Sequence, residues 1–251
     1  MLYGLYLSAT GIMTNSYKQD VISNNLANTE TSGFKRDVPA FRQRLTAAQE
    51  GRDPSDWTDP LLEGIGGGIL AQPNHIDFEQ GDIEQTGSPL DVALQGEGFF
   101  GVDEGGKMRL TRDGRFQLDR NGALTLTGGQ RVLDPAGKPI TLSPDSPVVI
   151  DRTGQILQDG KTVSAIGLFD VPDKSKLTKL GNGLMQYPNP NQVTAAEPTV
   201  HSEHLEGSNV DPTTELSQLI ETQRQLEANA NMIHTQDSTL QLLVNNVGKI
   251  S

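Results

Sequence analysis

The sequence predicts a mainly β middle domain, rich in hairpins and similar to a sandwich or a barrel, between N- and C-terminal α-helices that pair as a coiled coil. The hydrophobic period is close to 3.5 residues near the end of the 251-residue chain and close to two in its middle. In the middle, turn-forming pairs recur about every eight to twelve residues, as in all-β domains. These observations divide the chain into residues 1–72 (N-terminal helix and extended linker), 73–200 (β domain) and 201–251 (C-terminal helix).

The C-terminal helix has the clearest pattern, a heptad seam without a break. A seam sustained over about four and a half repeats is typical of a coiled coil. Asp211 can cap the helix, and Pro212 suits its first position. We therefore expect a helix over 212–247. The seam consists of Leu216, Leu219, Gln223, Leu226, Ala230, Ile233, Asp237, Leu240, Val244 and Val247.

The N-terminal segment predicts a second helix, over about residues 3–27. One face carries apolar or small residues at helical spacing: Tyr6, Ala9, Met13, Tyr17 and Val21. A polar turn over 28–33 ends it, and residues 46–72 have loop composition. Neither helix can bury its apolar stripe alone, so the two ends of the chain are expected to meet.

The middle alternates short β-prone runs with turn pairs. Asn121-Gly122 and Asp159-Gly160 suit type I′ hairpins, in which both central residues need positive φ. No long helical pattern interrupts this region, which argues against a parallel α/β fold.

Composition excludes several classes of function. A net charge of −12 argues against nucleic-acid binding, which needs clustered Lys and Arg. The absence of cysteine removes disulfides, thiol catalysis and thiolate metal sites. No apolar run is long enough to span a bilayer. The mildly apolar start lacks a basic region and is interrupted by Gly4, Ser8 and Gly11, so we expect no cleaved signal peptide.

Three short patterns have alternative interpretations. Residues 96–101 match the GxGxxG string of dinucleotide sites, but the sequence that follows favours a hairpin over the required helix. His201 and His204 could contribute to a metal site only with ligands from elsewhere. The turn-rich acidic middle is also compatible with a carbohydrate-binding or adhesive protein. We expect no catalytic residue, cofactor or metal, and hence no enzyme.

Four blocks of sequence resemble signatures of the flagellar rod and hook protein family. Residues 24–36 read NNLANTETSGFKR, residues 90–100 read LDVALQGEGFF, residues 110–116 read LTRDGRF and residues 205–211 read LEGSNVD. The blocks lie in family order from end to end. The length and residues 129–142 are similar to the proximal rod protein, with the distal rod protein as the near alternative, and the Asp211-Pro212 helix start departs from the family pattern.

The resemblance implies a structural subunit of the flagellar basal-body rod, exported without a cleaved signal by the flagellar type III apparatus into the periplasmic rod. Its partners would be other rod and hook subunits, and copies of itself, with no nucleic acid and no membrane insertion. Residues expected at the assembly interface are Tyr6, Met13, Tyr17, Val21, Asn25, Ala27, Asn28, Gly33, Phe34, Ser208, Asn209, Val210, Leu216, Leu219, Ile220, Gln223, Leu226, Ile233, Leu240 and Val244.

Overall fold

The computed structural model describes residues 2–43, 68–144 and 146–247, and the chain forms two compact units. Within the described residues, unit 1 consists of residues up to 27, 37–75 and from 211 onward. Unit 2 consists of residues 28–36 and 76–210. The segment 28–36 therefore belongs with the β-rich part of the chain, although it directly follows the first helix.

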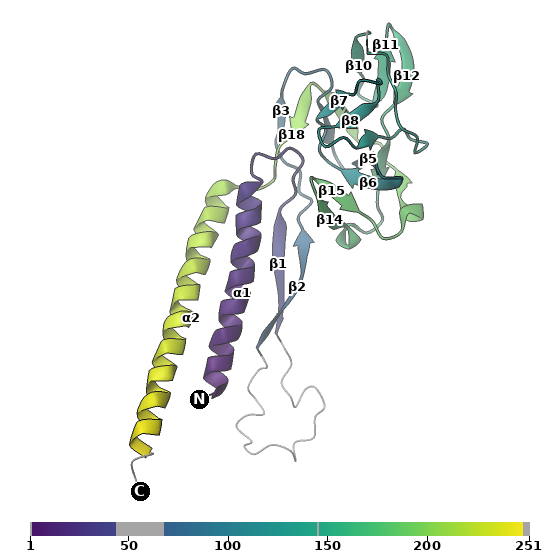
Figure 1. The fold of residues 1–251 in the computed structure, drawn as a ribbon. Helices are drawn as coiled ribbons and strands as arrows, with labels where there is room; N and C mark the ends of the chain where they lie inside the picture. The colour runs from purple at the N-terminus through teal and green to yellow at the C-terminus, as the bar shows by residue number, and fades with distance from the viewer. Residues whose placement is uncertain (1, 44–67, 145, 248–251) are drawn as a thin grey trace. The chain divides into compact units, whose positions relative to one another are not determined.

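Unit 1 contains the two predicted helices, α1 (Leu2–Ala27) and α2 (Pro212–Val247), which lie side by side in Figure 1. Gly4 contacts Gln236 and Gly11 contacts Asn229, so the helices run antiparallel. Asp211 caps α2 as predicted, because its carboxylate accepts the N–H groups of Thr213 and Thr214. Both helices are confirmed.

A two-stranded ribbon completes unit 1. It consists of β1 (Asp37–Gln43) and β2 (Ile69–Ile76), and β1 contacts α1. Tyr17 of α1 packs edge-on against Phe41 and donates a hydrogen bond to Asn74. The expected loop over 46–72 is wrong at its end, because residues 69–72 belong to β2, the strand that pairs with β1. The part of this loop up to residue 67 lies outside the described residues.

Unit 2 is built from short, mainly antiparallel strands, which confirms the β character of the middle region. A central sheet of nine strands accompanies two further pairs and a three-stranded sheet. The remaining elements of the unit are β3 (Ile83–Gln85), β4 (Val92–Gln95), β5 (Phe99–Glu104), β6 (Lys107–Thr111), β7 (Phe116–Leu118), β8 (Leu124–Leu126), β9 (Arg131–Val132), β10 (Val148–Ile150), β11 (Gln155–Gln158), β12 (Lys161–Ala165), β13 (Leu168–Asp170), β14 (Thr178–Gly181), β15 (Leu184–Gln186), β16 (Thr194–Ala195), β17 (Thr199–Ser202), β18 (His204–Glu206) and the 3₁₀ turns η3 (Lys174–Lys176) and η4 (Pro190–Gln192).

The nine-stranded sheet is apolar on both faces. Phe99 and Phe100 are adjacent in β5, and alternation sends them to opposite sides. Phe100 enters the main core with Val92, Leu124 and Val200. Phe99 enters a smaller core with residues such as Met185. The middle domain is therefore held by ordinary close packing.

The sheet does not close into a barrel, so the barrel alternative is wrong. Its path runs β14-β15-β6-β5-β9-β8-β7, with β13 and β16 attached to the side, and the terminal strands β14 and β7 do not pair with each other. Closure would require the short strands at the two ends of this path, β14 and β7, to pair in register.

One of the two predicted type I′ turns is present. Asp159 and Gly160 have φ of 51° and 73°. Asn121 does not take positive φ, and only Gly122 does, at 78°. Here Asp119 accepts N–H groups from Asn121 and Ala123, which forms a wider turn that needs one left-handed residue. The side chain of Asp119, two residues before Asn121, therefore decides the turn type.

Candidate functional site: a buried ion cluster and a polar helix pair

A fully buried ion cluster in unit 2 joins three distant parts of the sequence. The Lys35 ammonium lies 2.5 Å from one oxygen of Glu206, and Arg112 lies 3.0 Å from the other. The three side chains are 1 %, 6 % and 0 % exposed for Lys35, Arg112 and Glu206 respectively. Such burial keeps the cluster away from solvent, so it holds segments together and does not serve as an acid or base for an outside substrate.

Local backbone structure places each member of the cluster. Arg112 directly follows β6, and Glu206 is the last residue of β18, paired with Ile83 of β3. Lys35 follows the turn that ends at Gly33, whose N–H donates to the backbone oxygen of Glu206 at 2.7 Å. Gly33 has φ of 67°, and a Cβ there would collide with the backbone of Arg112. Only glycine allows the turn to approach this closely.

Backbone groups satisfy much of the remaining hydrogen-bonding capacity of the cluster. Lys35 also donates to the carbonyl of Glu79 at 2.7 Å, and Arg112 donates to that of Gly96 at 2.7 Å. The N–H of Gly81 donates to Glu206 at 3.3 Å. Because Glu206 is the counter-ion of both cations, removal of its charge would leave Lys35 and Arg112 buried without compensation.

Asn209, near the C-terminal end of unit 2, binds the segment 28–36 through hydrogen bonds. Its side-chain oxygen accepts the N–H of Arg36 at 2.7 Å, and its amide donates to the carbonyls of Asp77 and Glu79. The Lys179 ammonium lies 4.2 Å from the Phe34 ring centroid. The turn segment 28–36 is thus enclosed by β-domain and C-terminal residues.

Burial dominates the electrostatics of Lys35. Desolvation lowers the pKa of its ammonium below the ordinary 10.5, the nearby Glu206 acts in the opposite direction, and Arg112 adds to the lowering. Two cations share Glu206, while the nearby Asp77 is paired with Arg36 at 3.2 Å. The cluster therefore carries more positive than negative charge.

The helix pair of unit 1 is joined by polar and small residues. Asn25 is buried, donates to Glu215 at 3.4 Å and exchanges two hydrogen bonds with the backbone of Asp37. Thr222 is also fully buried. A Cβ on Gly4 would lie 2.7 Å from Gln236, and one on Gly11 would lie 2.9 Å from Asn229. The helices approach closely at these residues, while Ile22 is 1 % exposed and Leu219, Leu226 and Ile233 are half-buried.

The predicted interface residues fall into three environments. Five are buried: Val21, Asn25, Gly33, Phe34 and Val210. Eight are half-buried: Tyr17, Asn28, Ser208, Asn209, Leu219, Leu226, Ile233 and Leu240. Seven are exposed: Tyr6, Met13, Ala27, Leu216, Ile220, Gln223 and Val244. Within unit 2 the fold brings the Gly33–Phe34 turn against Asn209, whose N–H donates to the Phe34 carbonyl.

Sequence reasoning did not single out Lys35, Arg112, Glu206 or Glu215. Lys35, Arg112 and Glu206 lie inside the signature blocks, and a charged residue in such a block is the signal that was available. Charge pairing across 94 and 171 residues is not visible in a periodic pattern.

The weaker motifs form ordinary structure. Residues 96–101 lead into β5 and not into a helix, so no dinucleotide turn is formed. His201 bonds to Gln95 and His204 to the carbonyl of Ser202. No group of three potential metal ligands occurs within 2–43, 68–144 and 146–247. Over the same residues, no helix is long and apolar enough to cross a membrane.

Known proteins match the chain along its whole length. The family described as flagella basal body rod protein matches residues 5–35, the D1 domain of flagellar hook protein FlgE/F/G matches 93–158, and the C-terminal region of flagellar basal body rod FlgEFG protein matches 201–246. Flagellar basal-body rod protein FlgF of Caulobacter vibrioides is 34 % identical over 98 % of both chains. This chain belongs to the flagellar basal-body rod family.

Other rod-family relatives have similar identity. FlgG of Buchnera aphidicola is 33 % identical over 97 % of this chain and 99 % of its own, and FlgG of Bacillus subtilis is 31 % identical over 98 % and 99 %. The chain is therefore a structural rod subunit, which replaces the adhesive and nucleotide-binding alternatives. Lys35, Arg112 and Glu206 come one each from the three matched regions. The ion cluster is where those three regions join.

Proposed function

We propose that this rod-family chain assembles with copies of itself and with other rod and hook subunits into the tubular drive shaft that transmits torque across the periplasm. In this proposal α1 and α2 pair as a coiled coil and form an inner layer, and residues 73–200 form an outer layer. Residues 1–72 and 201–251 act together as the terminal domain. The observation that carries the proposal is the apolar surface left on the helix pair: Met13 and Val244 are 73 % and 70 % exposed.

The exposed apolar residues supply the driving force for assembly. Leu216, Ile220, Met232, Leu242 and Leu243 add to the exposed surface of α2. Full burial of a Leu or Ile side chain contributes about 1.5–3 kcal/mol, so several per subunit suffice to offset the ordering of the helices. A head-to-tail contact between like subunits that does not close generates a filament. The predicted interface residues named above are proposed to line this contact.

We infer the proximal rod type from the length and from residues 129–142, which are similar to the proximal rod protein. The first relative described above carries the name FlgF, which is compatible with this assignment. The distal rod type is the second candidate, because relatives named FlgG have almost the same identity. Export through the flagellar type III apparatus, without a cleaved signal, belongs to the same proposal.

Charge substitution in α2 tests the assembly. Leu226→Asp and Ile233→Asp place a carboxylate on the proposed seam and should abolish assembly, while unit 2 stays folded. Gln225→Asp introduces the same side chain at an exposed position of the same helix and serves as the control. Electron micrographs of basal bodies and a motility assay give the result. Normal basal bodies in a motile Leu226→Asp strain would contradict the interface.

A deletion strain tests whether the chain is a proximal or a distal rod protein. A filament grows by addition at its end, so loss of a proximal subunit should remove every segment beyond it. Loss of a distal subunit should leave a short proximal rod. Microscopy of basal bodies from a strain lacking this gene separates the two, and a short residual rod would assign the chain to the distal type.

A further inference from the structure

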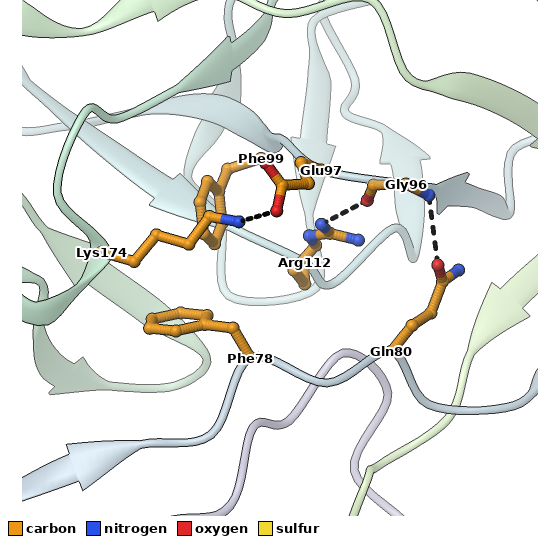
Figure 2. Close-up of a pocket in the computed structure, with 7 residues that line it drawn as sticks. All are labelled: Phe78, Gln80, Gly96, Glu97, Phe99, Arg112 and Lys174. Atoms are coloured by element: carbon orange, nitrogen blue, oxygen red, sulfur yellow. Dashed lines mark hydrogen bonds and ion pairs between the residues drawn. The ribbon is translucent and has the colours of Figure 1, made fainter.

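A small pocket in unit 2 lies beside the ion cluster, because Arg112 belongs to the cluster and also lines the pocket. It has a volume of about 210 Å³ and is lined by Phe78, Gln80, Gly96, Glu97, Phe99, Arg112 and Lys174, which Figure 2 shows. Cofactor and drug sites usually measure about 300–1,000 Å³, whereas about 150 Å³ already holds a benzene ring. The pocket therefore fits one side chain better than a cofactor.

Two phenylalanines and two cations give the pocket its chemistry. Phe78 and Phe99 meet edge to face with ring centroids 5.8 Å apart. The Arg112 guanidinium lies 5.4 Å from the centroid of Phe99, and its buried Nε has no hydrogen-bond partner among the described residues. Lys174, in η3, reaches the pocket and is 27 % exposed. An apolar wall beside fixed positive charge suits a carboxylate on a short hydrocarbon stem.

The chain already places one carboxylate at this position. Glu97 is 76 % exposed and lies 2.8 Å from the Lys174 ammonium, and Figure 2 shows the two side chains reaching toward each other beside Arg112. The hydrogen bond from Lys174 lowers the pKa of Glu97, and the charge of Arg112 contributes to the same lowering. Because Glu97 is exposed, it can turn into solvent and give up its place to another carboxylate.

The charge beneath the pocket is not balanced. Arg112 and Lys35 share the single carboxylate of Glu206, and Asp77 is occupied by Arg36. An incoming anion would thus meet a site whose own counter-ion, Glu97, is an exposed surface residue. The whole chain carries a net charge of −12, so a second copy presents many acidic side chains to such a site.

We propose that this pocket binds an aspartate or glutamate side chain of a neighbouring subunit, in the first instance a second copy of this chain, in exchange for Glu97. Lys174 is the direct ion-pair partner, Arg112 supplies positive charge behind it, and Phe78 and Phe99 pack against the stem of the bound side chain. The proposal that the carboxylate comes from a neighbouring subunit rests on the proposed assembly. The proposal that the pocket binds a carboxylate does not.

The site is tested on the full chain in solution by titration with N-acetylglutamate amide, followed by the amide resonances of Gly96 and Glu97. N-acetylglutamine amide is the neutral control of the same shape. We expect saturable shifts with the glutamate probe alone. Equal shifts with both probes, or no saturation, would overturn the site.

Two variants give opposite effects if the exchange is correct. Lys174→Ala should weaken binding about two- to fivefold, the factor that a partly exposed ion pair is worth. Glu97→Gln should tighten it by a similar factor because the internal competitor is gone. Lys176→Ala is the matched control, since this lysine lies in the same turn but pairs with Asp173 and does not line the pocket. Equal affinities of Lys174→Ala and Lys176→Ala for the glutamate probe would contradict the proposal.

The source of the carboxylate is tested by assembly. Sedimentation of assembled chains should show a lower polymer fraction for Lys174→Ala than for Lys176→Ala. Probe binding with identical assembly of the two variants would overturn the subunit source. Probe binding by a wild-type chain that never polymerises would refute the proposed assembly and leave the carboxylate site standing.

Discussion

The two units of this rod subunit are stabilised in opposite ways. Unit 2 encloses a packed core in which Val92, Leu124 and Ile156 have no exposed surface, and its buried charges are paired. In unit 1 polar pairs such as Asn25–Glu215 join the helices, and large apolar side chains such as Met13 and Val244 remain exposed. Unit 2 thus has a closed core within one chain, whereas unit 1 keeps exposed apolar surface that a partner could cover.

The largest effect should come from removing the shared carboxylate of unit 2. Glu206→Gln leaves Lys35 and Arg112 buried without a counter-ion and should lower the free energy of unfolding by about 3–5 kcal/mol. The loss of stability is measured by urea unfolding, monitored through the amide resonances of unit 2. Glu203→Gln, three residues earlier and exposed, is the control. Equal midpoints for the two variants would show that the cluster does not stabilise the unit.

The same substitution in each unit compares the two directly. Leu124→Ala empties space in a closed core and should cost about 2–5 kcal/mol. Leu216→Ala removes a side chain that is half exposed and should change the stability of the free chain by less than about 0.5 kcal/mol. Thermal unfolding of both variants checks this, and a large loss in Leu216→Ala would show that its side chain is already packed within the monomer.

The lowered pKa of Lys35 predicts a pH dependence confined to unit 2. Its folded pKa lies below the ordinary 10.5, so between the two values the unfolded chain binds more protons and stability rises with pH. The wild type should therefore gain stability relative to Lys35→Met as the pH rises through the alkaline range below 10.5. Urea midpoints at several pH values measure the difference. A difference that stays constant would contradict the cause assigned to the shift.

The smallest effect concerns the start of α2. The hydrogen bond from Thr214, followed by that from the backbone of Thr213, lowers the pKa of Asp211 below 3.8. This contribution to helix stability is present above the unfolded pKa and is lost as the pH falls through the lower folded value. Circular dichroism should show a slightly smaller helix signal for Asp211→Ala at neutral pH and no difference at strongly acidic pH. A difference that persists in acid would exclude the cap as its source.

Periodicity predicted the two helices of unit 1, but neither the β1–β2 ribbon nor the polar contacts between the helices. The bounds of α2 follow from Asp211, Pro212 and an unbroken seam. The covered face of α2 carries Glu215 and Thr222, which a search for apolar spacing passes over, together with half-buried seam residues such as Leu226. Polar contacts between helices depend on matching partners and not on period.

In unit 2 the sequence predicted the turns, but not the contacts between residues that are far apart in the chain. Glycine pairs located most hairpins, but the strand order and the open sheet depend on which short strands pair. Lys35 and Glu206 are 171 residues apart, and only the fold shows that a lysine in one signature block faces a glutamate in another. The candidate site was thus present in the motifs, while its geometry required the structure.

Amide hydrogen exchange of the full chain, before and after assembly, tests the contrast between the two units most directly. In the free chain, amides of Leu94 and Leu124 in unit 2 should exchange slowly, and those from Leu226 to the end of α2 should exchange fast. Assembly should slow the second set by orders of magnitude and leave the first unchanged. Strong protection throughout α2 in the free chain would contradict the account.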